Sequence, residues 1–185
     1  MHTIVHGFDW PDRIVVGAVG EPGSRTFYLQ ARDRARIVSV ALEKEQSAVL
    51  AEKIEEILDQ LMTRDGNPFS IPAETPAELV DNDPLEQPIQ TQFRTAALSL
   101  GWDSSTAQIV IEAYPLEEPE ENLHAAEPPQ EQEPTEMLVV RIPVGTARAF
   151  TKRILEVVSA GRPRCPLCGN PMDPDGHLCP MPGDV

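Results

Sequence analysis

Three cysteines and one histidine near the C-terminal end are the residues whose spacing specifies a chemistry most clearly. Cys165 and Cys168 lie in the run Cys-Pro-Leu-Cys-Gly, and His177 and Cys179 follow in His-Leu-Cys-Pro. Two thiolates separated by two residues form one half of a tetrahedral zinc site, and a second pair completes the ligand set. The sequence therefore predicts zinc as a cofactor, bound in a closed Cys3His knuckle that occupies residues 162–185.

Other interpretations of these residues stay open. The second pair has a single intervening residue, so Asp173 or Asp175 could replace one of its ligands. The thiols could instead form a redox pair or be unrelated to one another. A redox pair normally opens a helix in a thioredoxin-like context, which is missing in this proline-rich stretch. Such a short segment cannot bury a core, and this favours a metal as the element that holds it together.

Several arginines form a second group with possible chemistry, because they concentrate at the ends of the first predicted strands. Arg13, Arg25, Arg32 and Arg34 could bind a phosphate or a carboxylate-bearing ligand. They could equally be solvated turn charges that discourage pairing between sheet edges. No phosphate-binding glycine loop, nucleophile elbow or HExxH motif occurs, so the sequence assigns no catalytic residue.

The elements that precede the tail form two similar units. Residues 13–19, 26–31 and 37–42 read as strands separated by short turns. The apolar spacing then changes to a helical period, with one stripe formed by Leu50, Ile54, Ile57, Leu58 and Leu61. This predicts a βββα unit over residues 9–64, folded as an antiparallel meander.

The same pattern returns after a proline-rich connection at 65–92. Strands are expected at 93–100, around 109–113 and at 138–142, and a helix from about Thr146, as N-cap, to Ala160, with Gly161 beyond its end. Shifting the first unit by 100 positions aligns its third strand and helix with those of the second, in apolar and in two charged positions. This agreement predicts an internal repeat, with 93–161 as the second unit.

The expected fold class is α+β. Two βββα pseudo-repeats form an antiparallel sheet, or two abutting sheets, with both helices on one face. Residues 1–161 make up this domain, and the zinc knuckle follows it. The acidic segment 116–136 holds eight glutamates, four prolines and no Lys or Arg, so we expect a disordered loop there.

The composition limits the classes of binding partner and the cellular compartment that we expect for this protein. The formal net charge of −15 over 185 residues argues against a nucleic-acid binder, which needs a basic surface. No apolar run is long enough to span a membrane, and the first ten residues lack the features of a signal peptide. Thiols clustered at ligand spacing are typical of a reducing compartment, so we expect a cytoplasmic protein without nucleic-acid or membrane partners.

The chain as a whole resembles an actinobacterial family of unknown function. The resemblance rests on the Phe-Asp start, the Gly-Pro-Gly hairpin of residues 17–32, the acidic insertion and the cysteine-rich tail. It implies a cytoplasmic protein, often encoded near a phosphoglycerate-mutase-like phosphatase and a kinase-like protein. It implies no activity and no catalytic residues.

Together these patterns favour a non-catalytic adaptor whose zinc knuckle and acidic loop bind a protein partner. The alternative is a protein, or an enzyme, that binds phosphate or a phosphorylated metabolite through the arginines of the first hairpin.

Overall fold

A computed structural model of the chain describes residues 2–21, 23–116, 135–160 and 167. The acidic segment 117–134 and the four predicted zinc ligands lie outside the described residues. The elements in chain order are β1 (Ile4–Asp9), β2 (Arg13–Val19), β3 (Thr26–Asp33), β4 (Arg36–Leu42), α1 (Lys44–Met62), a short 3₁₀ turn (Ala77–Leu79), β5 (Thr91–Asp103), β6 (Gln108–Pro115), β7 (Glu136–Pro143) and α2 (Val144–Ser159).

The strands form a single seven-stranded sheet in the order β1-β7-β6-β5-β4-β3-β2. Within each predicted unit the strands pair antiparallel, as expected from their short turns. The expectation of an entirely antiparallel sheet is wrong, because β4 pairs parallel with β5 and β1 pairs parallel with β7. The long α1-containing connection between β4 and β5 permits this direction, which a tight hairpin would forbid. The fold class α+β is confirmed, as a mixed sheet.

Strand β1 was not predicted from the sequence. Gly7 and the neighbouring polar residues interrupt its apolar alternation, and only Phe8 is deeply buried, at 2% exposed. The guanidinium of Arg36 lies 4.0 Å from the centre of the Phe8 ring and helps to hold the strand. The pairing with β7 explains why this polar segment is extended.

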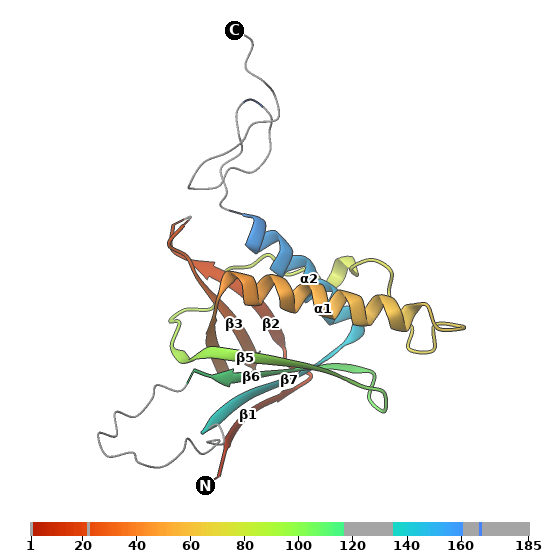
Figure 1. The fold of residues 1–185 in the computed structure, drawn as a ribbon, viewed down its shortest axis with the longest axis horizontal. Coiled ribbons are helices and arrows are strands. Elements are labelled where there is room, and N and C mark those ends of the chain that lie inside the picture. The colour runs from red at the N-terminus through yellow and green to blue at the C-terminus, as the bar shows by residue number, and fades with distance from the viewer. Residues whose placement is uncertain (1, 22, 117–134, 161–166, 168–185) are drawn as a thin grey trace, which may run out of the picture.

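The two edge strands of the sheet, β1 and β2, are consecutive in the chain. Only residues 10–12 join them, and three residues span at most about 10 Å. The sheet must therefore curl until its edges approach each other at this end, as the ribbon shows (Figure 1). Asp12 ties this link to the turn between β3 and β4, because its Oδ2 accepts a hydrogen bond of 2.7 Å from the backbone N–H of Arg34.

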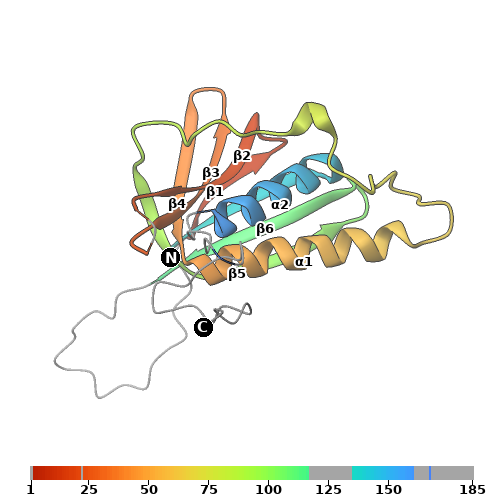
Figure 2. The same ribbon diagram turned by 90° about the horizontal axis from the view of Figure 1, so that it is seen from above.

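Both helices lie on the same side of the sheet and pack against each other (Figures 1 and 2). Each buries an apolar stripe in the common core, at Leu50 and Ile54 of α1 and at Phe150 and Ile154 of α2. These positions differ by 100, as the alignment of the two units predicts. Thr146 is not the N-cap of α2, because the helix begins at Val144 and Pro143 occupies that position.

An arginine joins the two helices. Arg148 of α2 is 4% exposed, pairs with Glu55 and lies 2.9 Å from Asp59 of α1. Its Nε also donates to the carbonyl oxygen of Pro72 at 2.9 Å. The charge is thus neutralised in a largely buried position, which such a group requires.

The connection between α1 and β5 wraps around the β2 edge of the sheet. It starts on the helix side, where Phe69 packs edge-on against Trp102 at 5.0 Å. It then passes β2, where Leu85 lies over Gly17 and leaves no space for a Cβ atom. The amide of Gln30 binds the backbone of Glu86 in both directions, at 2.8 and 3.2 Å. This wrapping covers a strand edge that would otherwise pair with another chain.

Candidate functional site

A strand edge without a strand partner arises where β4 stops and β5 continues. Their last paired residues are Ala41 and Arg94, whereas β5 extends to Asp103. On its other side β5 is paired with β6 along this stretch. Within the described residues, no strand pairs with the outer edge of β5 beyond Arg94. The backbone groups on that edge are a template for another strand.

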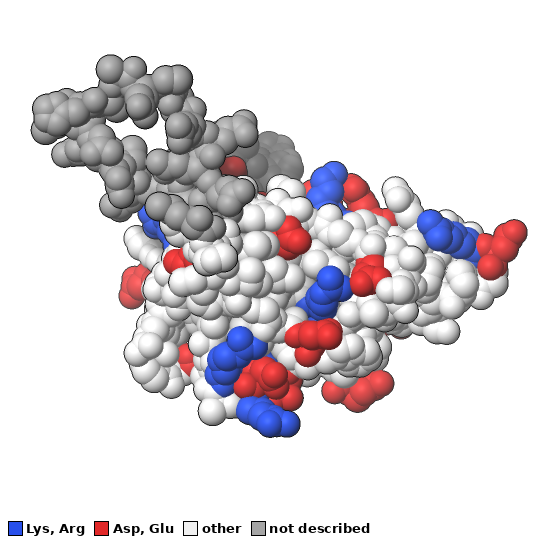
Figure 3. All heavy atoms as spheres, turned by 90° about the horizontal axis from the view of Figure 1, so that it is seen from below, with Lys and Arg blue, Asp and Glu red and all other residues white. Residues whose placement is uncertain are grey.

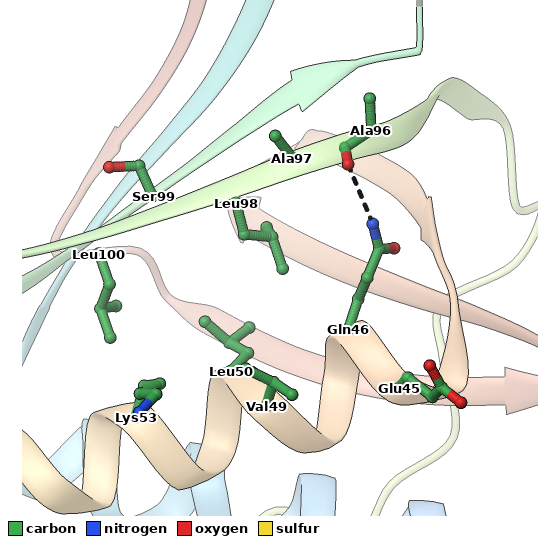
Figure 4. A pocket seen from close by; sticks show the side chains of 10 residues that line it. All are labelled: Glu45, Gln46, Val49, Leu50, Lys53, Ala96, Ala97, Leu98, Ser99 and Leu100. Carbon is green, nitrogen blue, oxygen red and sulfur yellow. Dashed lines mark hydrogen bonds between the residues drawn. The ribbon is translucent and has the colours of Figure 1, made fainter.

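Helix α1 runs beside this edge, and α1 and β5 together line a groove of about 450 Å³ (Figure 4). The side chains of Leu98 and Leu100 point from β5 toward the helix, and Val49 and Leu50 face them. Leu50 belongs to the core, but Val49 remains 51% exposed. The groove is therefore apolar along its length and open to solvent.

Gln46 closes one end of the groove. Its Nε2 donates to the carbonyl oxygens of Thr95 and Ala96, at 3.2 and 3.4 Å, directly after the last β4 pair. The side-chain amide of Gln46 thus binds two carbonyl oxygens of β5 in place of a neighbouring strand. Its Oε1 accepts from the backbone N–H of Glu43 at 2.8 Å, so the same side chain caps α1.

The rim of the groove carries one charge of each sign. Glu45 lies at the Gln46 end, and Lys53 lies near Leu100 at the other end (Figure 4). Lys53 is 57% exposed and pairs with Glu56 at 3.2 Å, a contact that contributes little because water screens it. Both rim charges are available to an incoming chain.

The predicted arginine site is occupied in large part by carboxylates of this chain. Asp81 receives two hydrogen bonds from Arg13, at 2.7 and 3.0 Å. These bonds lower the pKa of Asp81 and raise that of Arg13. Arg153 joins the cluster, with its Nη1 2.8 Å from the Asp81 carbonyl oxygen, and burial lowers its pKa.

Arg32 shares Glu86 with Arg13, whose Nη1 lies 3.8 Å from Oε1 of that residue, whereas Arg34 and Arg25 lie elsewhere. Arg32 forms an ion pair of 3.0 Å with Glu86, and the described contact of Arg34 is made by its backbone. Arg25 donates from Nη1 to the carbonyl oxygen of Ala160 at 2.9 Å, and its Nε is buried without a partner among the described residues. It lines a cavity of about 300 Å³ between β2 and the end of α2. The four residues do not converge on one point. On the face shown in Figure 3, basic and acidic side chains are interspersed.

The predicted metal site lies outside the described residues, because Cys165, Cys168, His177 and Cys179 all belong to the undescribed tail. In the part of the chain that is described, no three His, Cys, Asp or Glu side chains gather at a distance that would hold a metal ion.

Sequence reasoning missed the groove residues. One signal was available at Val49, which lies outside the apolar stripe of α1 and yet is apolar. Another was the unequal length of the paired strands, since β5 has 13 residues and β4 has 7. No local pattern indicates that these two strands are neighbours, and their difference in length has no apparent meaning without that information.

A family model described as "Protein of unknown function (DUF3090)" matches residues 6–179. The chain therefore belongs to this family. No curated protein and no solved structure gives a significant match. Among the described residues, no helix is long and apolar enough to cross a membrane.

Proposed function

We propose that this member of the DUF3090 family is a non-catalytic protein-binding module. The observation that carries the proposal is the groove between α1 and β5, where the half-exposed Val49 lies beside a strand edge that no described strand pairs with. Another polypeptide could bury this apolar surface with its own side chains and at the same time hydrogen-bond to the backbone of the strand edge. The net charge of −15 also favours a protein partner over a nucleic acid.

In addition to the groove, the C-terminal tail is proposed to make a second contact with the partner. Cys165, Cys168, His177 and Cys179 have the residue types and the spacing of a structural zinc knuckle. Four protein ligands leave no position for a reactive water, so zinc would organise a binding surface. A reducing cytoplasm would keep these thiols available to the metal.

The two βββα units are proposed to have arisen by duplication. Many of the buried positions of β4 and α1 are also buried 100 residues later in β7 and α2, including Ser47 and Ala147 as well as Val40 and Val140. In each unit, moreover, the last strand pairs parallel with a strand from outside the unit, β5 in one case and β1 in the other.

Affinity purification of the tagged full-length chain from its native cells tests the protein-binding function. Val49→Arg is expected to remove a specific partner, because a charge in the groove opposes burial of the partner's apolar surface. Leu155→Arg is the matched control, since Leu155 is 48% exposed on α2 and lies outside the groove. An identical set of partners for the wild type and Val49→Arg contradicts the proposal.

A small-ligand function is the second candidate, and Arg25 is the observation that favours it. Its buried Nε and the adjoining cavity could receive a phosphate or carboxylate group. A phosphorylated metabolite that binds there would raise the melting temperature of the wild type but not of Arg25→Ala. A metabolite screen with no such difference removes this candidate.

A further inference from the structure

We infer that the groove between α1 and β5 binds an extended peptide segment of the partner, which adds to the sheet as a strand beside β5. The inference rests on the proposed protein-binding function and specifies what is recognised. Beyond the end of β4 at Leu42, no described strand lies beside β5, and this is where the next strand of the sheet would lie. A chain in that position would bind the free backbone edge on one side and contact α1 on the other.

The geometry sets the length of the segment. The lining runs along β5 from Ala96 to Leu100, and a strand advances by roughly 3.3 Å per residue. The groove therefore receives a segment of about four or five residues. Gln46 limits it at one end, because its amide already occupies the carbonyl oxygens of Thr95 and Ala96.

Side chains of the added strand alternate between two environments. Every second one points toward the helix layer, as Leu98 and Leu100 do in β5, and reaches the apolar surface around Val49. The intervening side chains point the other way, as Ser99 does. The preferred peptide thus has two apolar residues two positions apart, with polar residues permitted between them.

The rim charges add a preference at the two ends. Glu45 favours a basic side chain beside Ala96, and Lys53 favours an acidic one beside Leu100. The partner segment that complements the groove is therefore apolar at its centre and oppositely charged at its ends. Exposed charges of this kind select a register and an orientation more than they contribute affinity.

Selection of random heptapeptides displayed on phage against the full-length chain tests the inference. We expect enrichment of sequences with apolar residues at every second position, and an affinity at least about tenfold lower for Val49→Arg. Leu155→Arg should bind as the wild type does, because it carries the same change at a similarly exposed site on α2. Enriched peptides without alternation, or equal binding to Val49→Arg, overturn the inference.

Backbone methylation distinguishes strand addition from docking of side chains alone. Each position of an enriched peptide is N-methylated in turn. Methylation should weaken binding about fivefold or more at every second residue, where an N–H faces β5, and little elsewhere. A uniform effect along the peptide contradicts strand addition. If Val49→Arg removes the cellular partner but no alternating peptide is enriched, this inference fails and the protein-binding function stands.

Discussion

Gly17 shows how a single residue holds the long connection against the sheet. A Cβ atom at this position would lie 2.5 Å from Cγ of Leu85, which is 6% exposed. Gly17→Ala is therefore expected to displace Leu85 and to lower the free energy of unfolding by about 1–3 kcal/mol. Chemical denaturation of the full chain measures this change.

Gly7→Ala is the matched control for that substitution. Gly7 also lies within a strand, but a Cβ atom added there would have no atom within 4 Å. Its replacement should leave stability unchanged or raise it by up to about 1 kcal/mol, because alanine has less freedom in the unfolded chain. Equal destabilisation by both substitutions would contradict the role of Leu85.

Asp103, the last residue of β5 before the turn to β6, has the most strongly shifted carboxyl group among the described residues. Hydrogen bonds from Ser105, whose Oγ lies 2.6 Å away, and from Arg141 lower its pKa to about 2 from the usual 3.8. The folded state therefore favours the ionised form. Its contribution to stability is complete above pH 3.8 and is lost as the pH falls through about 2.

Carboxyl-carbon NMR through an acid titration measures this pKa. The Asp103 resonance of the wild type should titrate near 2, and Ser105→Ala should move its midpoint upward because the largest single cause is removed. A wild-type midpoint close to 3.8 would show that the turn is not formed as described.

At the scale of elements, the contact between α1 and α2 depends on Arg148. Its side chain is 4% exposed, and its loss removes the cation beside Glu55, which keeps a hydrogen bond from Thr151, together with the described donor to the Pro72 carbonyl oxygen. Because the carboxylates left behind stay partly exposed, Arg148→Ala should lower the free energy of unfolding by about 1.5–3 kcal/mol. Lys152→Ala, which removes an exposed pair with Glu156, should cost less than about 1 kcal/mol in the same urea titration. Similar losses would contradict a special role for Arg148.

The elements differ in how far the sequence determines them. Alternation and helical period identify β2 to β7, α1 and α2, because these segments bury one face in a shared core. The pattern fails at β1, where deep burial is limited to Phe8 and the paired residues of β7 lie 132 positions further along the chain, as in Ile4 and Glu136. It also fails at the junction of β4 and β5, because strand direction across a long connection leaves no local signal.

In the candidate site, too, local features can be predicted from the sequence, whereas features that depend on the assembled sheet cannot. The arginines are visible in the sequence, but their carboxylate partners come from the connection near Asp81 and Glu86, which has no regular pattern. The groove depends on strand neighbours and on the early end of β4, which are properties of the assembled sheet. Metal-ligand spacing, in contrast, is local and can be predicted without any fold.

At the scale of the whole molecule, the tail is expected to carry zinc independently of the sheet. Protein purified without added metal should contain about one zinc per chain, and Cys168→Ser should lose most of it. Asp173→Asn is the control, and retention of zinc in this variant supports His177 and Cys179 as the second ligand pair. Equal zinc in the wild type and Cys168→Ser would exclude the proposed ligand set.

The central claim is that the β5 edge beside α1 is free in the isolated protein and is covered by a partner. Residue-resolved hydrogen exchange of the full chain, alone and with the captured partner, tests it most directly. In the free chain, every second amide between Ala97 and Gly101 should exchange rapidly, although β5 lies in the middle of the sheet. The partner should slow these amides and leave those paired with β6 unchanged. Protection of the whole stretch in the free chain, or no change on binding, would contradict the claim.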